Sequence, residues 1–133
     1  MRVGLFGGTF DPVHLGHLRA AENARFQLGL DLVFLVPAAH PPHRATAVSS
    51  ALDRYTMTAL ASAGSPLFIA SDIEMRRDGP SYTIDTVAVL EAQHPGDEIV
   101  LLVGSDAFSE MGGWRDSERL LDRVEVAVLP RPG

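Results

Sequence analysis

The sequence of 133 residues contains neither cysteine nor lysine, and all 11 of its basic side chains are arginine. The absence of cysteine excludes disulfides, thiolate zinc sites, iron–sulfur clusters and cysteine nucleophiles. The absence of lysine means that any cation binding a phosphate must be an arginine, a histidine or a metal ion. It also excludes the P-loop motif, whose lysine contacts the phosphates.

Long hydrophobic runs and an excess of positive charge are missing as well. No stretch approaches the roughly 18 apolar residues of a membrane span, and the N-terminus lacks the apolar region of a signal peptide. Acidic side chains number 17, so the net charge is −6, which gives no support for a nucleic-acid partner. We therefore expect a cytoplasmic protein with no membrane or nucleic-acid partner; the sequence does not indicate an oligomeric state.

Short apolar runs alternate with segments of helical periodicity along the whole chain. The expected strands are 2–6, 32–36, 67–70, 99–103 and 124–129; the expected helices are 15–28, 50–63 and 83–94, with short helical pieces in 105–121. This alternation is typical of an α/β protein with a parallel sheet. It predicts a Rossmann-like, doubly wound sheet forming a single domain over residues 1–133, with ligands at the carboxyl ends of the strands.

The spacing of apolar residues predicts which face of each helix is buried. The residues expected to point inward are Leu15, Leu18, Ala21, Ala24 and Leu28 in the first helix, Leu52, Tyr55, Ala59, Leu60 and Ala63 in the second, and Ile84, Val87 and Leu90 in the third. Gly29 is a stop signal for the first helix. Ser49 or Ser50 is a candidate N-cap for the second helix, and Thr83 is one for the third.

The segment between the first strand and the first helix has the composition of an anion site. Gly7 and Gly8 allow a ligand to approach the backbone closely, and the helix that follows directs free N–H groups toward it. His14 and His17 are three residues apart and share a helical face. Three interpretations remain open: two structural histidines, a zinc site that adds His40 and His43, or a phosphate site.

The motif Gly7 to His17, GGTFDPVHLGH, resembles the signature of HxGH nucleotidyltransferases, and its wording is most similar to bacterial nicotinate mononucleotide adenylyltransferases. Three further segments resemble this family in the same order. They are residues 37–44, which resemble its basic loop, residues 79–86, which resemble its nicotinate loop, and residues 104–106 with Trp114 downstream.

The resemblance implies transfer of AMP from ATP to nicotinate mononucleotide, with Mg²⁺ accompanying ATP. It implies roles for individual residues. His14 and His17 would be catalytic; Gly8, Thr9, Phe10, Arg44, Gly104, Asp106 and Arg131 would bind ATP or its phosphates; Tyr82, Thr83 and Trp114 would bind the nicotinate.

One feature of the family is missing from the sequence. The family continues into an ISxTxIR-like segment that helps to bind ATP phosphates, and this chain contains none, so we expect a chain that lacks the family's C-terminal segment. Two alternatives to the main interpretation follow. One is an adenylyltransferase for nicotinamide mononucleotide or another phosphorylated acceptor; the other is a nucleotide-binding module without catalysis.

Overall fold

The computed structural model describes residues 1–8, 10, 15–38, 50–76 and 82–129. Their helices and strands follow the expected order. The elements are β1 (Arg2–Gly8), α1 (Leu15–Leu28), β2 (Leu32–Pro37), α2 (Ala51–Ser62), β3 (Phe68–Ala70), α3 (Thr83–Gln93), β4 (Glu98–Gly104), α4 (Ser105–Glu110), a 3₁₀ turn η1 (Met111–Gly113), α5 (Ser117–Arg123) and β5 (Glu125–Leu129). All five predicted strands and the three long helices are thereby confirmed within two residues at each end.

The five strands form one parallel sheet in the order β3-β2-β1-β4-β5. The chain builds outward from β1 to β3, then crosses to the other side of β1 to place β4 and β5. This reversal makes the predicted doubly wound topology, and it puts the switch point between the carboxyl ends of β1 and β4. Gly8 ends β1 and Gly104 ends β4, so both glycines flank the crevice where such sheets bind ligands.

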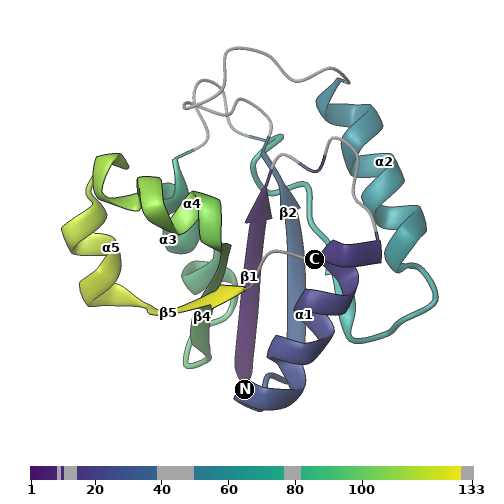
Figure 1. The fold of residues 1–133 in the computed structure, drawn as a ribbon, viewed down its shortest axis with the longest axis horizontal. Coiled ribbons are helices and arrows are strands. Elements are labelled where there is room, and N and C mark those ends of the chain that lie inside the picture. The colour runs from purple at the N-terminus through teal and green to yellow at the C-terminus, as the bar shows by residue number, and fades with distance from the viewer. Residues whose placement is uncertain (9, 11–14, 39–49, 77–81, 130–133) are drawn as a thin grey trace.

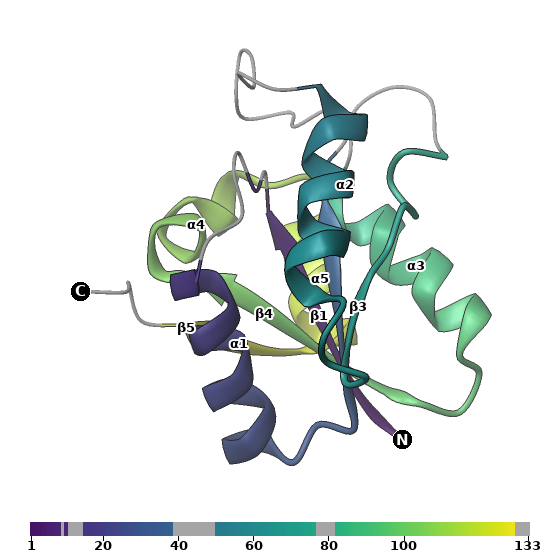
Figure 2. The same ribbon diagram turned by 90° about the vertical axis from the view of Figure 1, so that its right-hand side faces the viewer.

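Helices cover both faces of the sheet (Figure 1). On one face lie α1 and α2, which Figure 2 brings to the front; on the other lie α3 and α5. Each face has its own hydrophobic cluster. One joins Leu5, Phe34 and Leu101 to Val87, Leu90 and Leu120; the other joins Phe6, Leu35 and Leu102 to Ala21 and Ala24. The predicted inward residues of α3, and Ala21 and Ala24 of α1, are therefore buried as expected.

Local capping fixes the ends of α1 and α2. After α1, Gly29 has a φ of 65°, and the Leu30 N–H donates to the Arg25 carbonyl at 2.9 Å, which is the Schellman pattern. At the start of α2, the Asp53 N–H donates to the Ser50 hydroxyl at 3.1 Å. Gly29 is thus confirmed as the stop of α1, and Ser50 as the N-cap of α2.

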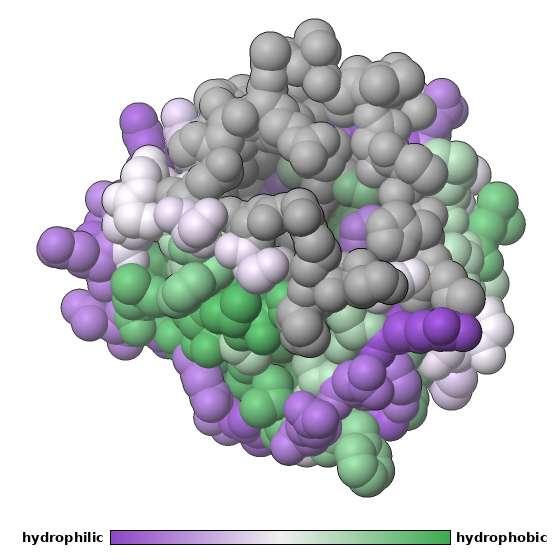
Figure 3. All heavy atoms as spheres, viewed as in Figure 1, coloured by the Kyte–Doolittle hydropathy of each residue, from purple (hydrophilic) through white to green (hydrophobic). Residues whose placement is uncertain are grey.

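The predicted buried face of α2 is wrong. Leu52 and Leu60 are 62% and 73% exposed, whereas the buried residues of the helix are Arg54, Thr58 and Ser62. Hydrophobic residues accordingly appear at the right-hand edge of Figure 3, where Figure 1 shows α2. The polar stripe is tolerated because the Thr58 hydroxyl donates to the Arg54 carbonyl at 2.8 Å and the Ser62 hydroxyl to the Thr58 carbonyl at 2.9 Å. Short side chains whose hydroxyls donate to backbone carbonyls of the same helix can pack on the sheet without leaving a polar group unpaired.

Ion pairs join the strands at the end of the sheet opposite the switch point. The Met1 amine donates to Asp97 Oδ1 at 2.8 Å, just before β4. The Arg2 guanidinium, on β1, reaches Glu98 of β4 at 2.9 Å and Glu125 of β5 at 3.2 Å. Within the described ranges, no helix is long and apolar enough to cross a membrane.

Candidate active site at the switch point

The carboxyl end of β1 is bonded directly to that of β2. Gly8 and Pro37 are register partners, and the Ala38 N–H donates to the Gly8 carbonyl at 2.8 Å. This bond extends the ladder one residue beyond β2 and holds the start of the Gly-rich turn. The turn therefore has a fixed base on the sheet, which a backbone anion site needs for preorganised donors.

Phe10 occupies a strained position in this turn. Its φ is 49°, in the left-handed region that favours glycine, yet its side chain is only 4% exposed. A Cβ placed on Gly8 would lie 3.4 Å from the Phe10 ring, so the ring packs directly against the glycine. The resemblance predicted backbone contacts from Phe10; the structure adds a buried ring that packs against Gly8.

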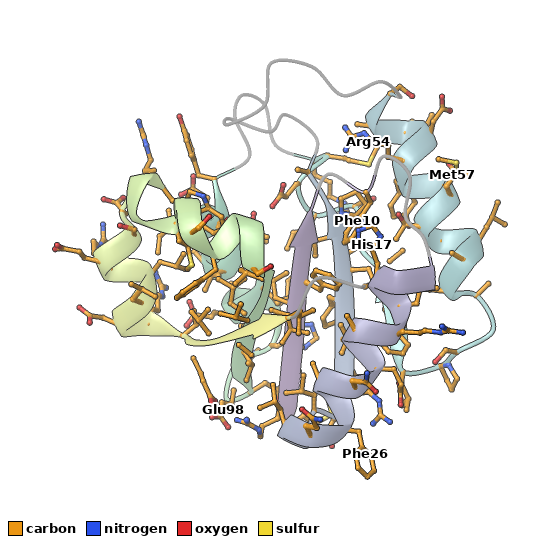
Figure 4. All side chains as sticks on the ribbon, in the orientation of Figure 1. Phe10, His17, Phe26, Arg54, Met57 and Glu98 are labelled. Atoms are coloured by element: carbon orange, nitrogen blue, oxygen red, sulfur yellow. The ribbon has the colours of Figure 1, made fainter. Side chains whose placement is uncertain are left out.

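His17 lies against this ring. Its imidazole meets Phe10 with ring centroids 5.3 Å apart and planes at 85°, and Phe6 at 6.3 Å and 65°. Both are edge-to-face arrangements, which favour one ring orientation over others. Figure 4 shows Phe10 and His17 side by side at the end of the sheet opposite Glu98. The structure therefore brings Gly8, Phe10 and His17 together at this end of the sheet.

Several predicted phosphate-site residues lie outside the described part of the chain. These are Thr9, His14, Arg44 and Arg131, and the side chain of Asp106, whose backbone lies at the second position of α4, two residues after Gly104. His40 and His43 lie outside it as well. The zinc interpretation needs them together with His14, so it stays untested; within the described residues, no three histidines, cysteines or acidic residues gather as a metal site would require.

The predicted nicotinate residues gather on the opposite face of the sheet from α1. Tyr82 is the residue before α3, with φ −86° and ψ 134°, and Thr83 is the first helical residue. Tyr82, and not Thr83, therefore occupies the N-cap position, so the prediction that Thr83 caps this helix is wrong. Tyr82 and Trp114 are both partly buried against the same hydrophobic cluster, and the Arg115 guanidinium lies over the Tyr82 ring at 4.5 Å. The Tyr82 ring and the Arg115 guanidinium thus border the start of α3, and Trp114 packs against the same cluster.

A buried acid beneath α3 was missed by the sequence analysis. The Thr86 hydroxyl donates to Glu74 Oε2 at 2.6 Å, and both residues are nearly fully buried, at 1% and 6% exposure. Thr86 also bonds to the carbonyl of Tyr82 through its N–H, at 3.2 Å. The segment after β3 is thereby attached to the first turn of α3. No local pattern signals this contact, because Glu74 lies in a polar stretch that reads as a solvated loop.

Arg54 was missed for a different reason. Its side chain is 2% exposed and its Nη1 donates to the Ala38 carbonyl at 2.6 Å, at the carboxyl edge of the sheet. A signal was present in the sequence: Arg54, Thr58 and Ser62 recur every four residues. The prediction instead followed the apolar residues on the other side of the helix, such as Leu52 and Leu60.

Comparison with known proteins assigns the chain to a protein family. Over residues 5–132 the sequence matches the cytidylyltransferase-like family, and the chain belongs to that family of nucleotidyltransferases.

Within this class, the chain resembles one kind of enzyme. It is 47% identical over 133 residues to a Thermus thermophilus protein named "Probable nicotinate-nucleotide adenylyltransferase", covering 100% of the chain and 71% of the relative. A Geotalea uraniireducens protein of the same name is 45% identical, and the chain spans 62% of its length. Both relatives are therefore longer than the 133 residues of this chain.

Solved structures support the same fold. The nicotinic acid mononucleotide adenylyltransferase of Plasmodium falciparum, solved in complex with NaAD, superposes with a TM-score of 0.80 at 15% identity, over 99% of this chain and 76% of that one. At this identity the likeness establishes the Rossmann-like fold, with five parallel strands between two helical layers.

Proposed function

We propose that the chain acts as a cytoplasmic nicotinate-nucleotide adenylyltransferase, which transfers AMP from ATP to nicotinate mononucleotide. The observation that carries the proposal is a match of 45–47% identity along the whole chain to relatives of that name. The arrangement of the site supports it. Two groups of residues flank the switch point, Gly8, Phe10 and His17 on the α1 side, and Tyr82, Thr83 and Trp114 on the α3 side.

The reaction requires positioning more than activation. A phosphate oxygen of the mononucleotide attacks the α-phosphorus of ATP, a new P–O bond forms, and the bond to the β-phosphate breaks to release pyrophosphate. The nucleophile is already anionic, so no enzymic nucleophile is needed, and catalysis consists of alignment and charge neutralisation. His17 supplies a hydrogen-bond donor for the phosphates, and Gly8 leaves room for them to approach the backbone. We assign the same phosphate-binding role to His14, Thr9, Arg44 and Arg131.

The acceptor side suits a pyridine ring bearing a carboxylate. The first N–H groups of α3, at Thr83 and Ile84, precede the first intrahelical bonds, since Asp85 and Thr86 are the first to donate to the Tyr82 carbonyl. A carboxylate accepts from such donors with favourable charge. Trp114, like Tyr82, is partly buried against the hydrophobic cluster under α3, and we assign its indole the role of a flat surface for the ring.

Magnesium belongs to the substrate in this proposal. Mg²⁺ is commonly held by ATP phosphates and water with one or two protein carboxylates. The ion would neutralise charge on the leaving pyrophosphate, while Gly104 and Asp106 would hold the nucleotide at the end of β4.

A comparison of acceptors tests the proposal. The protein is incubated with MgATP and, separately, nicotinate mononucleotide, nicotinamide mononucleotide, phosphopantetheine or glycerol phosphate, and both pyrophosphate and the adenylylated product are quantified. We expect the highest catalytic efficiency with nicotinate mononucleotide. Higher efficiency with another acceptor would change the assigned acceptor but leave the assignment as an adenylyltransferase in place. Binding of ATP with no pyrophosphate from any acceptor would identify a non-catalytic nucleotide-binding module.

A further inference from the structure

The guanidinium of Arg54 is buried where the mechanism gives it no task. Arginine is almost never fully buried unless its charge is paired, because desolvating it costs several kcal/mol. Arg54 lies in the first turn of α2, and its side chain is 2% exposed. Thr58 and Ser62, one and two turns further along the same face, are short enough to let α2 pack closely on β2 and β3. The contacts of the buried guanidinium therefore indicate what this residue does.

The position of the guanidinium suggests the reason. Its Nη1 donates to the Ala38 carbonyl at 2.6 Å, and the N–H of the same residue donates to the Gly8 carbonyl at 2.8 Å. Ala38 is thus held from both sides, by α2 on one and by the Gly-rich turn on the other. A charge-assisted donor is shorter and stronger than a neutral one, which suits a bond that fixes the last residue of a strand pair.

Contacts continue from Gly8 to the histidine. The Phe10 ring packs at 3.4 Å from the position of a Gly8 Cβ, and the His17 imidazole meets the edge of the same ring at 5.3 Å. Figure 4 shows Arg54, Phe10 and His17 grouped at one end of the sheet. An unbroken series of packed or hydrogen-bonded groups therefore joins the guanidinium to the imidazole.

We propose that Arg54 is a positioning residue for the triphosphate site, acting through Ala38 and Gly8 to hold the Gly-rich turn in the geometry that binds ATP. The inference rests on the proposed function, since it assigns ATP to that turn. Arg54 holds the base of the turn and does not itself contact substrate. Its removal affects the nucleotide side of the switch point and leaves the mononucleotide side, built on α3, unchanged.

The test separates ATP binding from acceptor use. Dissociation constants for a non-hydrolysable ATP analogue are measured by calorimetry, alongside the KM for nicotinate mononucleotide and the thermal midpoint, in the parent protein, Arg54→Met and Arg54→Lys. Arg119→Met is the matched control, because Arg119 is 73% exposed and pairs only loosely with Asp116, at 3.8 Å. All assays are run well below the lowest thermal midpoint.

We expect Arg54→Met to weaken binding of the ATP analogue by about ten- to hundredfold, as small misplacements in a preorganised site do, while the KM for the mononucleotide changes less than about twofold. Arg54→Lys, which keeps a charged donor, recovers part of the loss, and Arg119→Met matches the parent. Parent-like binding of the analogue by folded Arg54→Met would overturn the inference, as would equal losses for both substrates, which indicate a structural role alone.

A measurement on the parent covers the case in which Arg54→Met does not fold. The Arg54 side-chain N–H resonances, assigned by comparison with Arg54→Lys, should shift when the ATP analogue is added and stay in place when the mononucleotide is added alone. Unchanged resonances at saturating analogue would refute the inference. Failure of the proposed function has a different signature, namely an analogue that binds but no adenylyl transfer to nicotinate mononucleotide.

Discussion

The edge of the Phe10 ring meets the imidazole of His17 with centroids 5.3 Å apart and planes at 85°. The contact places a histidine of the proposed phosphate site on a residue whose φ of 49° only glycine adopts without strain. At Phe10, a strained backbone that destabilises the fold is therefore combined with a buried aromatic ring that stabilises it. The balance between the two can be measured.

Phe10→Gly removes the ring and relieves the backbone at once. Loss of a buried phenylalanine commonly costs about 3–5 kcal/mol, whereas relief of a strained φ returns about 1 kcal/mol. We expect a net loss of about 2–4 kcal/mol in urea unfolding. Phe26→Ala is the control, because Phe26 is 80% exposed and its loss should change stability by less than about 0.5 kcal/mol. A Phe10→Gly protein as stable as the parent would show that the ring contributes little.

His17→Ala should lower turnover by at least about 100-fold while circular dichroism shows the parent fold, because one preorganised donor commonly contributes that much. Steady-state rates with MgATP and nicotinate mononucleotide measure this. His94→Ala provides the comparison, since His94 packs on Phe34 at 5.2 Å in the segment between α3 and β4. That variant should lose stability but keep turnover within about threefold. A His17→Ala rate within threefold of the parent would remove the catalytic assignment.

The preference for nicotinate over nicotinamide mononucleotide should reach at least about tenfold in kcat/KM, because an amide presents its NH₂ to the donors at the start of α3 at a cost of about 1–3 kcal/mol. Thr83→Pro deletes one donor and should reduce this preference. Proline is tolerated there because Thr83 is the first helical residue and Tyr82 already has the extended backbone that precedes proline. Trp114→Ala should instead lower efficiency with both substrates. An unchanged preference in Thr83→Pro would exclude its N–H from recognition.

Thr86→Val should destabilise the protein by about 1.5–3 kcal/mol, because it removes the buried hydroxyl that donates to Glu74 at 2.6 Å and keeps the shape of the side chain. Thr86→Ser retains the donor and should lose less. Thr56→Val removes an exposed hydroxyl that bonds within α2, and should change stability by less than about 0.5 kcal/mol. Urea unfolding of the three variants orders them; equal effects of Thr86→Val and Thr56→Val would contradict the prediction.

The pH dependence of stability should carry the signature of the Met1–Asp97 pair. The Met1 ammonium lowers the pKa of Asp97 below its ordinary 3.8, and Asp97 raises the pKa of the Met1 amine above 8.0. The carboxylate's contribution is present above pH 3.8 and is lost as the pH falls through its lowered pKa; the amine's is present below pH 8.0 and is lost as the pH rises through its raised pKa.

Asp97→Asn should therefore lower the thermal midpoint most between about pH 5 and pH 7.5, with a smaller difference from the parent at about pH 2.5 and pH 10. The exposed Asp122→Asn on α5 serves as the control and should follow the parent profile. Mass spectrometry establishes that the Met1 amine is intact in both variants. A midpoint difference that stays constant across the pH range would show that the pair does not stabilise the fold electrostatically.

Periodicity predicted the strands and helices well because burial on both faces of a parallel sheet leaves unbroken apolar runs, such as 32–36 and 99–103. It failed on α2. A helix beside the short edge strand β3 has little apolar surface to cover, and Thr58 and Ser62 suit that close approach better than leucine. The burial of Arg54 depends on a carbonyl sixteen residues earlier in the chain. Periodicity within one helix carries no information about such a partner.

The candidate site was predictable where its residues are adjacent in sequence. Gly8, Phe10 and His17 belong to one motif, and the structure groups them. The left-handed φ of Phe10 was not predictable, because phenylalanine rarely adopts that backbone conformation. The pairing of Glu74 with Thr86 was not predictable either, because it joins two separate segments of the chain.

The two helical layers of the sheet have a consequence for how such proteins diversify. On the ATP side, Phe10 belongs to the cluster under α1 and His17 packs on its ring, while on the acceptor side Tyr82 and Trp114 pack against the separate cluster under α3. Substitutions that reshape one cluster leave the other's contacts in place. Variation confined to the α3 layer would therefore alter the proposed acceptor site and leave the packing of Phe10 and His17 intact.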